Sequence, residues 1–237
     1  MGGLAKGLLR LVAEGDEHGV ADGVADSVAD GTADGIADGT ADGTADGVGE
    51  PIVVRTARTV RRVFGADAEI VLVGRDVDHG DAYARLGFVE IADEPAGIGP
   101  MGGLRGACLF AEKQGHPWVL LLGCDMPFVS ASLLEALSRA RGEGEDVSAV
   151  TPRANGRLQP LCAFYRTSSG LQVTERQIAA GRFGLTEGVL ALRPRIVDVA
   201  PDDVRSLRDW DTPDDVLQDA GAWPALHGEP ARGAKEE

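Results

Sequence analysis

Apolar positions follow two different spacings in the part of the chain after residue 50. In "EPIVVRTARTVRRVFG" (50–65) a proline occupies a helix-start position and apolar residues recur three and four positions apart, which predicts an amphipathic helix. Short continuous apolar runs such as "AEIVLVG" (68–74) predict buried strands instead. The longest run, "WVLLLGC" (118–124), has the length of a strand and is too short to span a membrane.

Strands and helices alternate along the rest of this region. Further strands are predicted at 88–93, within 117–130, and at 146–152, 158–165 and 194–200, and further helices at 81–87, 102–113, 131–142, 168–181 and 212–220. This alternation predicts an α/β protein, with three α/β/α layers and a mostly parallel sheet between helices on both faces. Ligands of such sheets bind beyond the carboxyl ends of the strands, so the loops that follow strands are the first place to look for function.

A four-residue repeat interrupts the amino-terminal part. Residues 20–47 contain seven units of the form [V/T/I]-A-D-[G/S], a period that fits neither a helix face nor a strand. Its glycines make ordering costly and its small side chains bury little, so we expect an inserted disordered tract; a weak cation-binding tract is the alternative. We therefore divide the chain into one domain formed by 1–13 and 49–220, the insertion at 14–48, and a flexible tail at 221–237.

Charge and cysteine content narrow the function classes. The 237 residues include 38 acidic and 23 basic side chains, a formal net charge of −15, which argues against nucleic acid and anionic membranes as partners. The 3 cysteines form no CxxC pair, no signal peptide is visible, and no apolar stretch reaches membrane-spanning length. The sequence therefore predicts a cytoplasmic protein.

An acidic residue follows the most apolar strand. In "LLLGCDMPF" (120–128), Asp125 stands at the strand tip before a proline. A carboxylate in that place suits Mg²⁺, which takes one or two protein carboxylates together with phosphate oxygens. The alternative is that Asp125 caps the next helix.

A second acidic residue precedes a glycine-rich loop. In "ADEPAGIGPMGGLRGA" (92–107), Asp93 ends a strand, and the glycines let backbone approach a ligand before a helix that we expect to start near Gly102. This pattern suits a nucleotide base or ribose hydrogen-bonded to Asp93. The alternative is a long connecting loop.

Three other stretches carry polar groups that could bind a substrate. In the opening "MGGLAKGLLRL", Gly2 and Gly3 could approach a phosphate and Lys6 could neutralise it, or the stretch is an unstructured terminus. "RLQPLCAFY" (157–165) places Arg157, Gln159 and Tyr165 at a strand edge, and "DWDTPDDV" (209–216) places Asp209 and Asp211 before a helix, where either acid could be a cap. The 4 histidines are scattered and no Ser-His-Asp or Cys/His metal spacing occurs. Carboxylates, glycine loops and one lysine without a nucleophile favour phosphoryl or nucleotidyl transfer.

Taken in order, these stretches resemble the molybdenum cofactor guanylyltransferases of the MobA type. "GGLAKGLLRL" is similar to the second half of that family's L-A-G-G-x-x-x-R-M-G-G-x-x-K-x-L-L signature. "GPMGGL" resembles its G-P-L-A-G-L, "CDMPF" its C-D-x-P-x, "QPLCAFY" its Q-P-L-x-x-x-Y and "DWDTPDDV" its N-x-N-T-P-E-D. The resemblance covers 1–12 and 50–217 and implies a Rossmann-like nucleotidyltransferase fold.

The resemblance also implies a reaction and a site. The chain would attach GMP from GTP to the molybdopterin-bound cofactor and release pyrophosphate, with the terminal phosphate of the pterin as nucleophile. Gly2, Gly3 and Lys6 would contact the GTP phosphates, Arg75 and Asp93 the nucleotide, Asp125 the Mg²⁺, and Gln159, Asp209 and Asp211 the pterin side. GTP and molybdopterin would be the small-molecule partners, and cofactor-biosynthesis or molybdoenzyme-delivery proteins further ones.

Two departures from the family pattern change these expectations. The L-A-G-G-x-x-x-R half of the signature is absent, so we expect the first, central strand of the sheet to be missing and its neighbours to be left unpaired. Since Met1 falls on the methionine of the motif, we expect the codons upstream of Met1 to encode the missing half. Asp209 and Asp211 replace the family's asparagines.

Two alternative functions stay open at this point. One is a cytidylyltransferase or another nucleotidyltransferase of the same fold, against which "GPMGGL" is the main argument for guanine. The other is a truncated, non-catalytic remnant whose acidic repeat mediates contacts.

Overall fold

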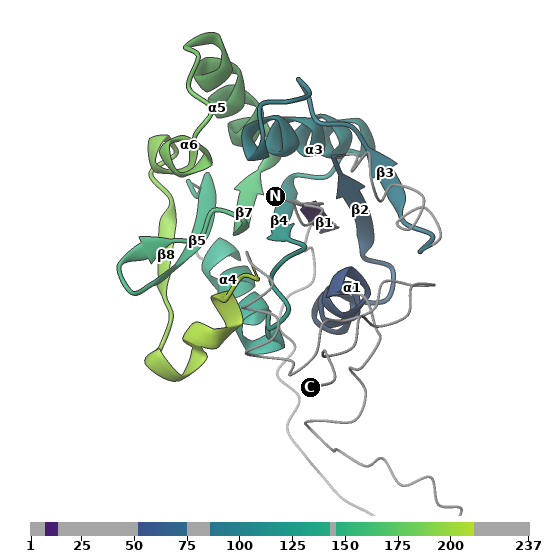
Figure 1. Cartoon of the computed structure of the whole chain (residues 1–237), viewed down its shortest axis with the longest axis vertical. Coiled ribbons are helices and arrows are strands. Elements are labelled where there is room, and N and C mark those ends of the chain that lie inside the picture. Colours follow the sequence, from purple (N-terminus) through teal and green to yellow (C-terminus); the bar gives the residue numbers. More distant parts are fainter. Residues whose placement is uncertain (1–7, 14–51, 75–85, 143–145, 211–237) are drawn as a thin grey trace, which may run out of the picture.

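An eight-stranded sheet forms the centre of the molecule (Figure 1). The computed structural model describes residues 8–13, 52–74, 86–142 and 146–210. Its strands are β1 (Leu8–Ala13), β2 (Glu69–Val73), β3 (Val89–Ile91), β4 (Trp118–Gly123), β5 (Ala149–Ala154), β6 (Arg157–Leu158), β7 (Cys162–Arg166) and β8 (Arg195–Asp198). They pair in the order β3-β2-β1-β4-β7-β5-β6, with β8 paired to β5.

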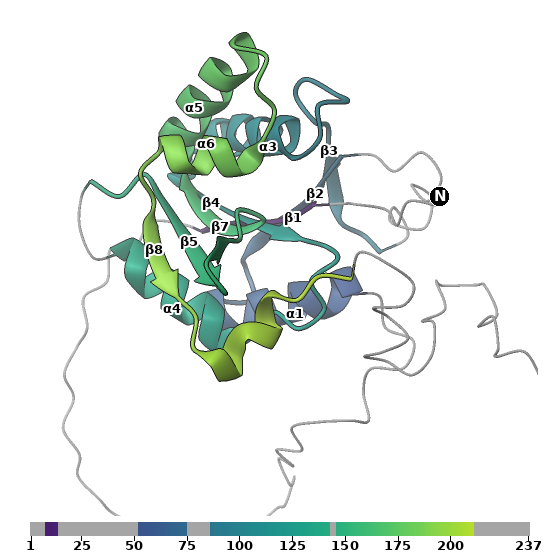
Figure 2. The same ribbon diagram turned by 60° about the vertical axis from the view of Figure 1, so that its left-hand side comes forward.

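Helices cover both faces of this sheet, so the predicted α/β class with three layers is confirmed (Figure 2). The helices are α1 (Ile52–Phe64), α3 (Pro100–Gln114), α4 (Ala131–Gly142), α5 (Thr167–Ala179), α6 (Leu185–Ala191) and the 3-10 helix η1 (Pro201–Leu207). One face packs against α3, α5 and α6, and the other against α1, α4 and η1. Among the described residues, no helix is both long and apolar enough to cross a bilayer.

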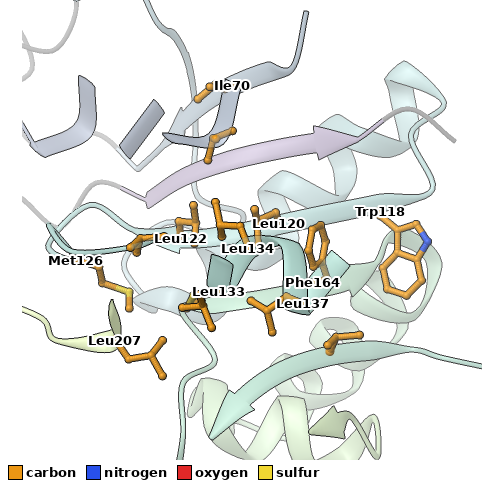
Figure 3. Packing of buried hydrophobic residues seen from close by; sticks show 14 of the residues in the cluster. Ile70, Trp118, Leu120, Leu122, Met126, Leu133, Leu134, Leu137, Phe164 and Leu207 are labelled. Carbon is orange, nitrogen blue, oxygen red and sulfur yellow. The ribbon is translucent and has the colours of Figure 1, made fainter. Parts of the chain in front are cut away.

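Strand β4 contributes to both apolar layers, which explains its uninterrupted apolar sequence. Leu120 and Leu122 point into the layer shared with α1 and α4, whereas Val119 and Leu121 point into the layer shared with α3. All four are fully buried, and burial of each stabilises the fold by about 1.5–3 kcal/mol. Figure 3 shows the first of these layers, with Trp118 at one end and Met126 and Leu207 toward the other.

The strand directions differ in part from the mostly parallel sheet that we predicted. Strands β2, β3, β4, β5 and β8 run one way, while β1, β6 and β7 run the other. Only two of the seven strand pairs, β2–β3 and β5–β8, are parallel. The sheet is therefore mixed, because β1 and β7 lie on either side of β4 and both oppose it.

The expected gap at the centre of the sheet does not exist. Residues Leu8–Ala13 occupy the position between β2 and β4 and pair with both strands in the antiparallel sense. An empty central position would leave the inner edges of β2 and β4 without backbone partners, and those groups are costly to bury unpaired. The prediction that the central strand is missing and its neighbours are unpaired is therefore wrong. Residues Leu8–Ala13 fill the central position and run antiparallel to β2 and β4.

Several element boundaries also differ from the prediction. The single strand expected at 158–165 is two strands, because Pro160 lacks an N–H and a turn closes there from the Cys162 N–H to the Gln159 carbonyl. Helix α3 begins at Pro100, before Gly102, and α6 and η1 were not predicted. The expected helices at 81–87 and 212–220 lie wholly or mostly outside the described residues, as does the repeat at 20–47.

Candidate functional site

The two strand-end carboxylates predicted from the sequence lie at one edge of the sheet. Strands β2, β3 and β4 all end at this edge, which we call the carboxyl edge. Register aligns a row of Cα partners across four neighbouring strands there: Ile91, Val73, Leu8 and Gly123. Asp93 follows this row on β3 and Asp125 follows it on β4, so chain segments far apart in the sequence bring both carboxylates to the same edge.

Asp125 is half-buried: its carboxylate lies over Gly123, and its backbone carbonyl is hydrogen-bonded. Its Oδ1 lies 2.5 Å from the position that a Cβ atom on residue 123 would take, so the carboxylate folds back over Gly123. Its backbone carbonyl accepts a 2.8 Å hydrogen bond from the N–H of Trp210. The helix that follows is capped by another residue, since the hydroxyl of Ser130 accepts from the N–H of Leu133 at 3.2 Å. The alternative role of Asp125 as the cap of α4 is therefore excluded.

Asp93 is also half-buried, and its carboxylate lies against the end of β2. Both of its carboxylate oxygens lie 3.3 Å from where a Cβ atom of Gly74 would be. Gly74 has a φ of +84°, and its N–H donates to the carbonyl of Ile91 at 3.1 Å, which ties the end of β2 to β3. A side chain at residue 74 would be strained in that conformation and would crowd the Asp93 carboxylate.

The two carboxylates lie over the ends of different strands. Asp93 lies against Gly74, which follows β2, and Asp125 lies over Gly123, which ends β4. Strand β1 lies between β2 and β4, so the two strand ends are two strand spacings apart, about 10 Å. This arrangement can hold two parts of one extended ligand.

The residues present fit Mg²⁺ in a specific way. No cluster of three or more His, Cys, Asp or Glu side chains that could hold a metal occurs among the described residues. Asp125 thus offers one ordered carboxylate, which suits an ion that takes its remaining ligands from phosphate oxygens and water.

The glycine-rich loop after Asp93 has two kinds of glycine. Gly97 and Gly99 adopt positive φ values of 82° and 68°, with nothing within 4 Å of an added Cβ, so they shape the open loop. A Cβ on Gly102 or Gly106, within α3, would instead collide with the backbone carbonyls of Pro95 and Ala92 respectively. The helix glycines Gly102 and Gly106 therefore serve close packing of α3 on the loop, whereas we had expected the glycines of this stretch to let the backbone approach a ligand.

The loop with Gln159 lies at the same edge. The N–H of Gly123 donates to the carbonyl of Leu161 at 2.8 Å, which joins this loop to the end of β4. Gln159 is half-buried, and its backbone carbonyl accepts from Thr151 Oγ1 at 3.2 Å. Tyr165 is fully buried, and its hydroxyl donates to Pro160 O at 2.8 Å. Because the phenol is buried and donates to this loop, it supports the loop and does not face a ligand; the same burial raises the pKa of Tyr165.

Comparison with known proteins decides the family. Residues 44–187, more than half of the chain, match the MobA-like NTP transferase domain. The chain belongs to this family. A probable molybdenum cofactor guanylyltransferase from Opitutus terrae is 29% identical over 171 residues, 70% of this chain and 80% of that protein. A molybdenum cofactor guanylyltransferase from Pseudomonas putida is 32% identical over 172 residues, 72% of this chain and 83% of that protein.

A solved structure gives a weaker similarity. The molybdopterin-guanine dinucleotide biosynthesis protein A from Archaeoglobus fulgidus has a TM-score of 0.48 and 24% identity, over 62% of this chain and 74% of that chain. That similarity adds nothing to the assignment. As a MobA-like NTP transferase domain, the chain is a nucleotidyltransferase by family.

The remaining predicted site residues fall into two groups. Asp209 is exposed and directly precedes Trp210, whose backbone N–H donates to the Asp125 carbonyl, so Asp209 and Trp210 come to the carboxyl edge. The others lie outside the described residues: Gly2, Gly3, Lys6, Arg75 and Asp211.

Two residues beside Asp125 were missed in the sequence. Gly123 carries no chemistry, and the only signal for it is a glycine two positions before a strand-end acid. Trp210 was quoted within "DWDTPDDV" without a role, and nothing in the sequence pairs it with a loop 85 positions earlier (210 minus 125).

Proposed function

We propose that this chain transfers GMP from GTP to the molybdopterin-bound molybdenum cofactor and releases pyrophosphate, as a guanylyltransferase. The observation that carries the proposal is the Asp125 carboxylate lying over Gly123 at the carboxyl edge, the same edge as Asp93 and its glycine loop, in a chain of the MobA-like family. The names of the two relatives support the guanine nucleotide and the pterin acceptor.

The two acids follow different strands and take different parts of GTP. Asp93, whose carboxylate lies against Gly74 at the end of β2, accepts hydrogen bonds from the nucleoside, and Asp125, which follows β4, holds the metal beside the phosphates. Bound Mg²⁺ supplies positive charge that the triphosphate needs as it is attacked. Lys6, with Gly2 and Gly3, contacts the phosphates, and Arg75, next to Gly74, contacts the nucleotide.

The substrate supplies the nucleophile in this mechanism. An oxygen of the pterin's terminal phosphate forms a bond to the α-phosphorus of GTP, and the bond from that phosphorus to the β-phosphate oxygen breaks, releasing pyrophosphate. The chain contributes positioning and charge, which is the main part of catalysis in such transfers. Gln159, Asp209 and Asp211 hold the pterin side at the edge of the sheet next to Asp125.

The test measures product and base choice together. The chain is incubated with molybdopterin-bound cofactor, Mg²⁺ and either GTP or CTP, and pyrophosphate and the dinucleotide product are quantified. We expect GTP to be used and Asp125→Asn to remove the activity. Asp67→Asn is the matched control, because Asp67 is exposed and lies before β2 at the opposite edge of the sheet. Transfer from CTP alone would overturn the guanine assignment, and full activity of Asp125→Asn the metal assignment.

A further inference from the structure

The segment at 205–210 contacts the loop that carries Asp125 along its length, through hydrogen bonds and ring contacts. This loop, residues 124–130, connects β4 to α4 without regular secondary structure. At its start the N–H of Trp210 donates to the Asp125 carbonyl at 2.8 Å, and at its end Ser206 Oγ donates to Ser130 Oγ at 3.0 Å. Two hydrogen bonds thus tie both ends of the loop to one short segment distant in sequence.

An aromatic and cationic stack holds the middle of the same loop. The rings of Phe128 and Trp210 meet edge to face with centroids 5.7 Å apart and planes at 86°. The guanidinium of Arg205 lies over the Phe128 ring, 4.2 Å from its centroid. Trp210 is only 8% exposed, so its buried ring holds the residue in place, and with it the backbone N–H that donates to the Asp125 carbonyl.

We propose that Trp210 is a positioning residue for Asp125, fixing the peptide of the metal-holding carboxylate through its N–H and its ring contact with Phe128. The inference rests on the proposed role of Asp125 in the guanylyltransferase function. Mg²⁺ demands near-ideal octahedral geometry, so a carboxylate on a loop without regular structure needs its backbone held. The Trp210 N–H fixes the carbonyl side of Asp125, while Gly123 leaves room for the carboxylate on the other side.

Trp118, on strand β4 that leads to Asp125, provides a matched control for Trp210. It is 9% exposed, close to the value for Trp210, and two guanidinium groups lie over its ring, Arg166 at 4.8 Å and Arg141 at 6.0 Å from the centroid. Trp118 begins β4, whereas Trp210 contacts the residue that follows the other end of that strand. Replacing Trp118 therefore removes a comparable aromatic anchor without touching Asp125.

The experiment measures Mn²⁺ binding to the full chain in the presence of GTP, from the electron paramagnetic resonance signal of free Mn²⁺. We expect Trp210→Ala to weaken Mn²⁺ binding about tenfold or more, the range typical for groups that orient metal ligands, and Trp210→Phe to restore most of it. Arg205→Gln, at an exposed side chain, gives a smaller loss without risk to folding. Trp118→Ala is expected to lower thermal stability and leave Mn²⁺ affinity unchanged.

Three outcomes would overturn the inference. The first is wild-type Mn²⁺ affinity in Trp210→Ala, and the second is an equal loss of affinity in Trp118→Ala. The third is an Asp125→Asn variant that binds Mn²⁺ as tightly as the wild type. Failure of the proposed function looks different: the wild type then binds Mn²⁺ and GTP through Asp125 and responds to Trp210→Ala, yet transfers no GMP to molybdopterin.

Discussion

The Asp125 carboxylate occupies the space that a side chain at Gly123 would take, because Oδ1 of Asp125 lies 2.5 Å from the position of an added Cβ. The glycine is the fourth residue of the "LLLGCD" stretch, two positions before Asp125, and ends β4. Because glycine has no Cβ, the Asp125 side chain can turn back over the strand end. The orientation of the carboxylate therefore depends on a glycine at residue 123.

Gly123→Ala is expected to reduce Mg²⁺-dependent transfer roughly tenfold or more, the effect typical of disturbing a metal ligand's surroundings. The added methyl group displaces the end of a flexible side chain, and its next nearest neighbour is the Met126 side chain at 3.3 Å, so we expect the fold to persist. Initial rates over a Mg²⁺ titration, with circular dichroism to check folding, measure the effect. An alanine variant with wild-type Mg²⁺ dependence would show that the carboxylate works in another orientation.

Gly106→Ala is expected to destabilise the protein by about 1–3 kcal/mol, as overpacking does elsewhere. Its Cβ would collide with the backbone carbonyl of Ala92, which cannot rotate away, and Asp93 is the next residue, so GTP binding should weaken as well. Urea unfolding and GTP titration measure the two effects.

Gly142→Ala is the matched control for Gly106→Ala. Residue 142 ends α4, is exposed, and has nothing within 4 Å of an added Cβ. It should gain about 0.4–1 kcal/mol through the unfolded state. If both variants changed stability in the same direction, the packing of α3 on the loop would not be the cause.

Stability should fall at alkaline pH because of Cys162. Burial raises the pKa of this thiol to about 12, so the folded chain keeps the proton while the unfolded thiol loses it above about pH 8.5. The folded pKa is the higher one, so this contribution is present below about pH 8.5 and is lost as pH rises toward 12.

The comparison with Cys162→Ala isolates this effect from that of Tyr165. Between neutral pH and about pH 10.5, the wild type should lose about 2–3 kcal/mol more unfolding free energy than the variant. Urea unfolding at both pH values measures the difference. Parallel pH profiles would show that the thiol ionises without unfolding.

Removal of the repeat at 20–47 is expected to leave transfer activity near the wild-type level. The match to the family domain begins at residue 44, so nearly all of the repeat lies outside the matched stretch. Loops tolerate changes in length cheaply, because closure entropy grows only logarithmically. Specific activity and soluble yield of the deletion variant measure the effect, and a large loss of folded protein would contradict the interpretation of the repeat as an insertion.

Features set by local sequence were the ones that could be predicted. Helix α4 occupies 131–142 as expected, because its apolar residues recur at helical spacing and no proline or glycine interrupts them before the end. Asp125 and Asp93 were placed at strand ends for the same reason: each is covalently close to an apolar strand, and strand ends need no long-range information.

Features that depend on distant partners could not be predicted. The direction of β1 follows from pairing with β2 and β4, and the same residues could pair in either sense. The roles of Gly102 and Gly106 became clear only once α3 was packed on the loop of Ala92 and Pro95. Trp210 reached Asp125 through a chain turn that no periodicity reveals.

The central place of β1 has a consequence for how the molecule assembles. Within the described sheet, β1 alone joins β2 and β3 to the strands from β4 onward. Leu8 pairs with Gly123, 115 positions later (123 minus 8). Strand β1 therefore lacks one of its two partner strands until β4 has left the ribosome. Such long-range pairing makes folding slow. The two halves of the sheet can therefore form before they are joined, and we expect the pairing of β1 with both halves to come late in folding.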